Sequence, residues 1–128
     1  MTIDSLDHFV ITVRDADATI AFYRDVLGMQ PERFAGGNRL ALKFGKQKIN
    51  VHVAGREFEP KADVALPGTA DVCFLTSVPL DDVVAALRAR NVAIIEGPVD
   101  KTGAQGKLRS VYVRDPDRNL IEISNLVR

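Results

Sequence analysis

The sequence has one cysteine, two histidines and no tryptophan. The lone Cys73 has no partner for a disulfide within the chain, so a reducing, cytoplasmic location is expected. Strand alternation points Cys73 inward, where a small packing residue is the ordinary interpretation. No apolar run is long enough to span a membrane. The N-terminal residues Met1-Thr2-Ile3-Asp4 also lack the basic flank and apolar core of a signal peptide.

Neither sign of charge is in excess. Lys and Arg together number 17, as do Asp and Glu, for a formal net charge of +0. No basic run offsets this balance, so the composition gives no support to nucleic-acid binding. A chain of 128 residues is long enough for one domain with a buried core, and we expect a single domain over residues 1–128.

Hydrophobic periodicity predicts eight strands and two helices. The first helix has Asp15 or Asp17 as its N-cap and Gly28 as its stop. The first helix is expected to end near residue 27, and the second to span residues 79 to about 90. Residues 97–107 are expected to form a loop. The expected strands are 6–13, 30–34, 39–44, 47–53, 70–76, 92–96, 108–113 and 120–124.

The order of these elements occurs twice. One βαβββ unit covers about residues 4–54, a Pro-containing linker about 55–68, and a second unit about 69–126. The pattern therefore predicts an α+β fold. Joined edge to edge, the two units would curl into an open, eight-stranded half-barrel with its helices outside and its second strand face lining the hollow.

Four ligand-type side chains occupy matching places in the two units. His8 and His52 lie on the first and last strands of the first unit, and Asp71 and Glu122 on those of the second. By the two-residue period of strands, all four lie on the face opposite the helix-facing residues. A carboxylate within the apolar strand 120–124 needs a cation, a metal or water beside it. Our central hypothesis is that His8, His52 and Glu122 meet at one metal ion.

Several stretches resemble a known superfamily. They are Leu6-Asp7-His8-Phe9-Val10-Ile11-Thr12-Val13, Phe22-Tyr23-Arg24-Asp25-Val26-Leu27-Gly28-Met29, Lys48-Ile49-Asn50-Val51-His52, and the run from Tyr112 to Glu122 with its Arg-Asp-Pro-Asp turn. Together they resemble the vicinal oxygen chelate proteins, which include glyoxalase I, extradiol dioxygenases, fosfomycin-resistance enzymes and bleomycin-resistance proteins. The narrower likeness is to the glyoxalase domain-containing 5 type and its bacterial virulence-associated relatives.

The resemblance implies a divalent metal, Mn, Fe, Ni or Zn, held by His8, His52 and Glu122. It implies a small vicinally oxygenated substrate. Three kinds of chemistry fit: glyoxalase-like lyase or isomerase chemistry, dioxygenase chemistry, and thiol or water addition to an epoxide. Asp71 stands where some relatives have a fourth ligand, and it is also a candidate general base. Tyr112 is a candidate substrate contact, with a half-buried strand aromatic as the alternative. Arg118 replaces the family's usual glycine after Asp-Pro-Asp.

The same resemblance implies a homodimer, with the site built within one chain or across two. The alternative function is metal-free sequestration of a small molecule, as in bleomycin-resistance relatives, and a structural dimer module is a third reading. The segment Gly97–Lys107 is either a mobile lid or a plain surface loop. Arg39 and Lys43 share a face that suits an anionic substrate, although a solvated edge strand explains them equally well.

Overall fold

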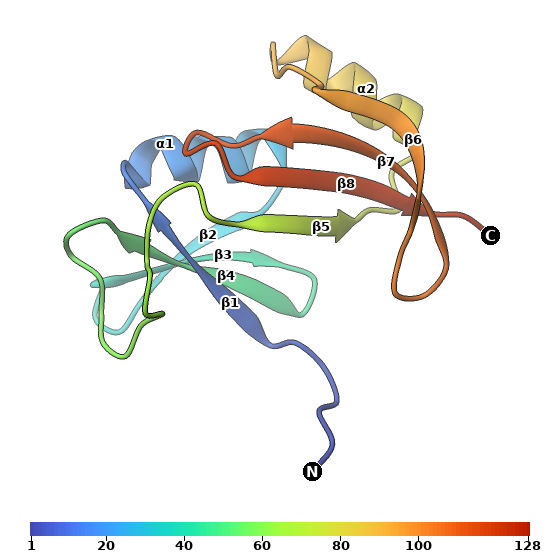
Figure 1. Cartoon of the computed structure of the whole chain (residues 1–128). Coiled ribbons are helices and arrows are strands. Elements are labelled where there is room, and N and C mark those ends of the chain that lie inside the picture. The colour runs from blue at the N-terminus through green and yellow to red at the C-terminus, as the bar shows by residue number, and fades with distance from the viewer. The chain divides into compact units, whose positions relative to one another are not determined.

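The computed structural model describes all of residues 1–128, which divide into two compact units, Met1–Thr69 and Ala70–Arg128. Each unit forms its own four-stranded mixed sheet and contributes one α-helix (Figure 1). The predicted α+β class and the repeated βαβββ order are therefore confirmed. No helix is long and apolar enough to cross a membrane.

The first unit contains β1 (His8–Val13), β2 (Gln30–Phe34), β3 (Arg39–Phe44) and β4 (Gln47–Val53), in the spatial order β1-β4-β3-β2. The outer β1 runs parallel to β4, and the other pairs are antiparallel. One face of the sheet is apolar and buried, with Ile11, Val13, Leu40, Leu42, Ile49 and Val51 in the core. The opposite face carries the polar side chains and is free to hold a site.

The helix of the first unit begins where the sequence predicts. The Asp15 side chain accepts hydrogen bonds from the backbone N–H groups of Asp17 and Ala18, at 2.9 and 3.2 Å, which caps α1 (Ala16–Ala21). The helix then changes to a π-helical turn, η1 (Phe22–Val26), and ends before Gly28. Tyr23, from this turn, is fully buried and contributes to the core.

The second unit contains β5 (Asp71–Leu75), α2 (Leu80–Ala89), β6 (Glu96–Thr102), β7 (Lys107–Arg114) and β8 (Leu120–Leu126), with sheet order β5-β8-β7-β6. Strand β5 runs parallel to β8, as β1 does to β4 in the first unit. Helix α2 packs against β7. The buried face of this sheet carries Val111, Val113, Ile121 and Ile123.

The prediction for residues 92–107 was wrong in part. Residues 92–95 are not a strand, and β6 covers Glu96–Thr102, so that only the short connection to Lys107 is a loop. Strand β6 lies at the sheet edge, pairs only with β7, and carries a bulge between Glu96 and Val99. A polar, bulged edge strand lacks the apolar alternation on which the prediction relied.

Candidate functional site

The polar face of the first sheet is arranged in rows across the strands. The register places Thr12, His52, Arg39 and Phe34 in one row, Val10, Asn50, Ala41 and Glu32 in the next, and His8, Lys48, Lys43 and Gln30 in the third. His8 and His52 therefore lie on the same face, as strand parity predicted. Parity alone, however, does not fix their separation along the strands.

The parallel register of β1 and β4 keeps the two histidines apart. His8 lies opposite Lys48, whereas His52 lies opposite Thr12, an offset of four residues. At a rise of about 3.3 Å per residue, this offset is about 13 Å along the sheet. Metal–nitrogen bonds are only about 2.0–2.1 Å long, and side chains stand perpendicular to the sheet. His8 and His52 of one chain therefore do not reach a common metal ion.

His8 is oriented by a carboxylate. Its Nδ1 lies 2.8 Å from Asp7 Oδ1, and its side chain is 42% exposed. A histidine whose Nδ1–H donates to a carboxylate has its tautomer fixed, and its Nε2 is left to accept a metal. Metal-binding histidines usually have such a carboxylate or carbonyl at the ring nitrogen that does not bind the metal.

His52 has a different environment. It is only 3% exposed, and its Nε2 lies 3.4 Å from the Nη2 atom of Arg39. Its ring also meets the edge of Phe58, with centroids 5.7 Å apart. Burial and the Arg39 guanidinium lower the pKa of His52, so the neutral ring accepts from Arg39. Binding a metal through Nε2 would require this contact to break.

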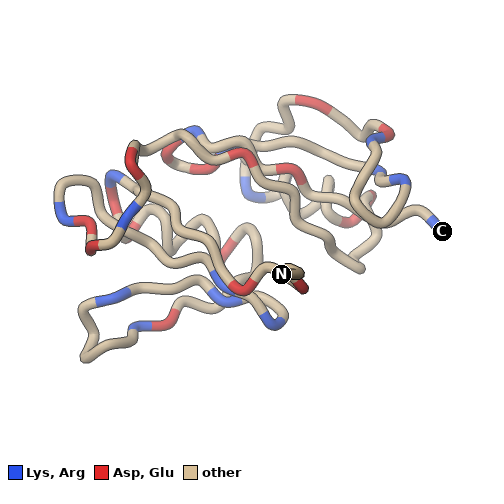
Figure 2. The backbone as a smooth tube through the Cα atoms, turned by 60° about the horizontal axis from the view of Figure 1, so that its bottom comes forward, with Lys and Arg blue, Asp and Glu red and all other residues tan.

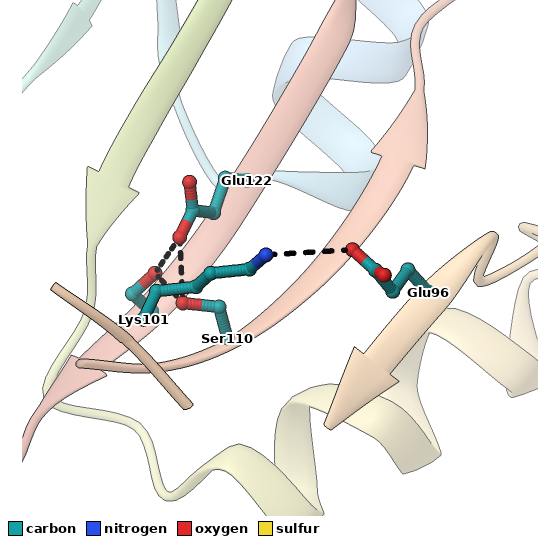
Figure 3. A network of polar contacts seen from close by, with 5 residues as sticks. Glu96, Lys101, Ser110 and Glu122 are labelled. Carbon is teal, nitrogen blue, oxygen red and sulfur yellow. Dashed lines mark hydrogen bonds and ion pairs between the residues drawn. The ribbon is translucent and has the colours of Figure 1, made fainter. Parts of the chain in front are cut away.

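In the second unit, Glu122 lies at the centre of a polar row. Tyr112 of β7 is directly opposite it on one side and Cys73 of β5 on the other. Its Oε2 accepts hydrogen bonds from the hydroxyls of Ser110, at 2.7 Å, and Ser124, at 3.3 Å (Figure 3). The two serine Oγ atoms lie 2.6 Å apart, so the Ser124 hydroxyl shares its proton between Ser110 and Glu122. The carboxylate is thus held in place through Oε2 by two buried hydroxyl groups.

The remaining predicted residues flank Glu122. Asp71 lies opposite Leu120, two residues before Glu122 and on the same face, where its side chain is exposed. Burial and the Glu122 carboxylate raise the pKa of Tyr112 to about 12, so the phenol is a hydrogen-bond donor at neutral pH. The Lys101 ammonium lies 5.5 Å from the Tyr112 ring centroid and 3.9 Å from Glu96 (Figure 3).

A cavity of about 370 Å³ opens beside this row. Its walls include Glu122, Tyr112, Cys73 and Lys101, and the turn residues Gly103 to Gln105. The interpretation of Cys73 as a packing residue was wrong, because the side chain is exposed and lines the cavity. A pocket of this size falls in the range that binds small organic ligands.

The two serines that hold Glu122 were not among the predicted site residues. Ser110 and Ser124 are fully buried, yet they share the outward face of β7 and β8 with Glu122. Their parity relative to Glu122 was the signal that could have identified them. No three His, Cys, Asp or Glu side chains are grouped closely enough to hold a metal ion by themselves. Each unit instead presents one well-oriented candidate ligand, His8 or Glu122.

Comparison with known proteins identifies relatives of this chain. Residues 5–123 match the family model described as the Glyoxalase/Bleomycin resistance protein/Dioxygenase superfamily. The chain is 54% identical over 127 residues to virulence protein STM3117 of Salmonella typhimurium, covering 99% of this chain and 88% of the relative. It is 50% identical to glyoxalase domain-containing protein RDO1 of Mycosarcoma maydis, covering 98% of this chain and 70% of that protein.

Solved structures with a similar fold include the same Salmonella relative. The crystal structure of STM3117 superposes with a TM-score of 0.97 over 99% of this chain and 100% of that chain. A lactoylglutathione lyase from Agrobacterium tumefaciens gives a TM-score of 0.74 over 98% and 96% of the two chains, at 22% identity. At that identity the likeness shows the fold alone.

Proposed function

Because the chain belongs to the glyoxalase/bleomycin resistance protein/dioxygenase superfamily, we propose that it is a divalent-metal-dependent enzyme acting on a small, vicinally oxygenated substrate. The observation that supports the proposal is the way in which the Glu122 side chain is held. Two buried serines hold one of its oxygens, and the residue lines a cavity that suits a small molecule. A carboxylate prepared in this way is typical of a metal ligand.

The proposed ligands are His8 and Glu122, with His52 as the third. His8 fits a metal because Asp7 fixes its ring. His52 fits less well, because its Nε2 lies against Arg39. Since the register separates the histidines of one chain, a site that uses both takes them from two chains. Asp71 is the alternative ligand beside Glu122.

A divalent ion held by imidazole and carboxylate would polarise the oxygens of a bound substrate. Two of the protein's own side chains would then act on the substrate. The protonated Tyr112 phenol would donate to a substrate oxygen, and the Asp71 carboxylate would accept a proton from an adjacent carbon or hydroxyl. These roles suit glyoxalase-like isomerase or lyase chemistry, with a dioxygenase reaction as the other class.

The test is metal analysis of protein purified without chelator. We expect about one divalent ion per chain in the wild type, and its loss in His8→Ala and Glu122→Gln. Glu96→Gln is the matched control, because Glu96 lies in the same row beyond Tyr112 and should leave the metal in place. Retention of metal in both ligand variants would refute the proposed site. Assays with a methylglyoxal–glutathione hemithioacetal, catechols and fosfomycin then separate the reaction classes.

The second candidate is metal-free sequestration of a small molecule. The cavity favours it, because Leu75, Leu108 and Leu126 line the space together with the polar groups. Such a protein would bind its ligand equally well after chelation, whereas the proposed enzyme would lose turnover.

A further inference from the structure

A second cavity, of about 330 Å³, lies within the first unit. Two arginines and an amide, Arg33, Arg56 and Asn38, contribute its polar wall, and the remaining lining residues are apolar. None of them is a proposed metal ligand or a neighbour of Glu122 in the sheet. A ligand in this cavity would therefore go beyond the proposed function.

The register of the first sheet brings Arg33 to this cavity. Arg33 of β2 lies opposite Leu40 of β3, and Leu40 lies opposite Val51 of β4, so the three residues form one row. Leu40 and Val51 are each 4% exposed, whereas Arg33, on the outer strand, is exposed. The row therefore ends in a guanidinium that solvent reaches, beside apolar side chains of the core.

The chain after β4 supplies the other walls. A turn closes where the backbone N–H of Arg56 donates to the backbone oxygen of Val53, at 2.9 Å. The Phe58 ring, which also lines the cavity, has the Arg39 guanidinium over it at 4.3 Å and meets the His52 ring at its edge. These contacts fix the turn and the ring, so the cavity is formed before a ligand binds.

The two arginines that line the cavity are not engaged by the protein. Neither the Arg33 nor the Arg56 side chain makes an ion pair or a hydrogen bond. The acids next to them in the chain have other partners, because Glu32 pairs with Lys43 and Glu57 accepts a backbone N–H. Charges of both signs are spread along the backbone (Figure 2), and the net charge is +0. Two free arginines at one cavity are therefore a local feature, not part of a general basic surface.

We propose that this cavity binds a small phosphate monoester, with its phosphate against Arg33 and Arg56 and its organic group against the apolar side chains. A guanidinium presents its N–H donors in a planar fork that matches phosphate oxygens. A phosphate monoester carries about −1.5 to −2 charges at pH 7 and three strong acceptor oxygens, so one ligand neutralises both arginines. A carboxylate, with one charge and two oxygens, matches only one of them. The cavity volume falls in the range that holds small organic ligands.

The test is a nuclear magnetic resonance titration of the full-length protein with phenyl phosphate, inorganic phosphate and benzoate. Benzoate keeps the ring but lacks the second charge, and inorganic phosphate lacks the ring. We expect phenyl phosphate to bind about 10-fold or more tightly than either, with shifts centred on Leu40, Val53 and Arg56. Binding no tighter than that of either comparison, absence of binding, or shifts centred on the cavity beside Tyr112 would overturn the proposal.

Three variants locate the contacts. Arg33→Met and Arg56→Met each remove a guanidinium and keep an apolar side chain of similar length. Each should weaken phenyl phosphate about 10-fold or more, because a charge-assisted bond is lost. Lys46→Met, in the exposed turn before β4, makes the same change of charge outside the cavity and should bind as the wild type does. Wild-type affinity in either arginine variant, or equal weakening in Lys46→Met, counts against a site in this cavity.

Discussion

Arg118, in the turn between β7 and β8, has a left-handed backbone with φ of 72°. The turn is fixed by Asp115, whose Oδ1 accepts the backbone N–H groups of Asp117 and Asn119, each at 2.9 Å. Asn119 in turn accepts the backbone N–H of Ala70 through its side chain. These bonds impose the left-handed conformation on residue 118, where a side chain other than glycine is disfavoured by about 1–2 kcal/mol.

Arg118→Gly should therefore stabilise the protein. After the entropy that glycine adds to the unfolded chain, we expect a gain of about 0.5–1 kcal/mol in the free energy of unfolding. Urea denaturation measures it. Arg118→Ala is the control, because it removes the side chain but keeps the Cβ atom, and it should change stability by less than about 0.5 kcal/mol. Equal stabilisation by alanine would mean that the arginine side chain, and not the left-handed backbone, destabilises the turn.

Tyr112 provides a prediction about alkaline pH. With a pKa of about 12, the folded protein holds the phenolic proton to higher pH than the unfolded chain, whose pKa is about 10. Between these values the unfolded state binds fewer protons, so stability falls as pH rises from about 10 to about 12. The variant Tyr112→Phe keeps only Tyr23, so subtracting its tyrosinate absorbance from that of the wild type gives the titration of Tyr112.

The neighbouring carboxylate gives this titration a second check. Burial is the larger cause of the raised pKa and Glu122 the next. In Glu122→Gln, the pKa of Tyr112 should therefore fall part of the way toward its ordinary value. An unchanged titration in Glu122→Gln would assign the whole shift to burial.

At the residue scale, strand parity was enough to put Glu122 and Asp71 on one face. Parity also puts Ser110 and Ser124 on that face, but it does not say which of the side chains there bond to Glu122. The contact of His52 with Arg39 was equally hidden, since the pairing of β3 with β4 decides which side chains share a row.

Strand β6 is the element that the sequence predicted least well. Its residues, Glu-Gly-Pro-Val-Asp-Lys-Thr, contain glycine, proline and three charged side chains, which together are typical of a loop. The strand exists because β7 offers a paired edge, and the bulge at Glu96–Val99 takes up the irregular start. Tertiary pairing has overridden local preference here.

Gly97 makes this bulge possible, and its replacement should be costly. A Cβ atom at Gly97 would lie 2.4 Å from the backbone oxygen of Ser110, and the residue has φ of +103°. Both the clash with backbone and the disallowed conformation remain in Gly97→Ala, so we expect a loss of about 3 kcal/mol or more in the free energy of unfolding. Urea denaturation gives the value.

Gly103→Ala is the matched control on the neighbouring turn. There a Cβ atom would meet the Leu108 side chain at 2.8 Å, which is able to move, and the nearest backbone atom, the Gly106 oxygen, is farther away at 3.1 Å. Its cost should be smaller, about 1 kcal/mol. Equal losses in the two variants would contradict the role given to the close approach of β6 and β7.

For the molecule as a whole, the sequence motifs identified the superfamily and the repeated unit, because both rest on patterns along the chain. The partner of each candidate ligand depends on strand offset and on assembly, and neither is encoded in hydrophobic alternation. The parallel register of β1 and β4 shows this most clearly, since it separates two histidines that parity had placed together. A homodimer, which the family resemblance implies, is the arrangement that would reunite them.

The register of β1 and β4, which separates His8 from His52, leads to a prediction about mixed dimers. If one ion uses both histidines, His8 and His52 come from different chains, so the homodimers of His8→Ala and of His52→Ala should each lose the metal. Coexpressing the two variants with different tags, and purifying through both tags, isolates the mixed dimer. One of its two sites then receives an intact His8 from the first chain and an intact His52 from the second.

We expect this mixed dimer to regain about half the wild-type metal content. A mixed dimer without metal would show that the two histidines do not share an ion across chains. Metal retained in the His52→Ala homodimer would instead remove His52 from the ligand set and leave His8 and Glu122, with Asp71 as the candidate third ligand. The register within the first unit makes these outcomes distinct, because it forbids a site in which both histidines belong to one chain.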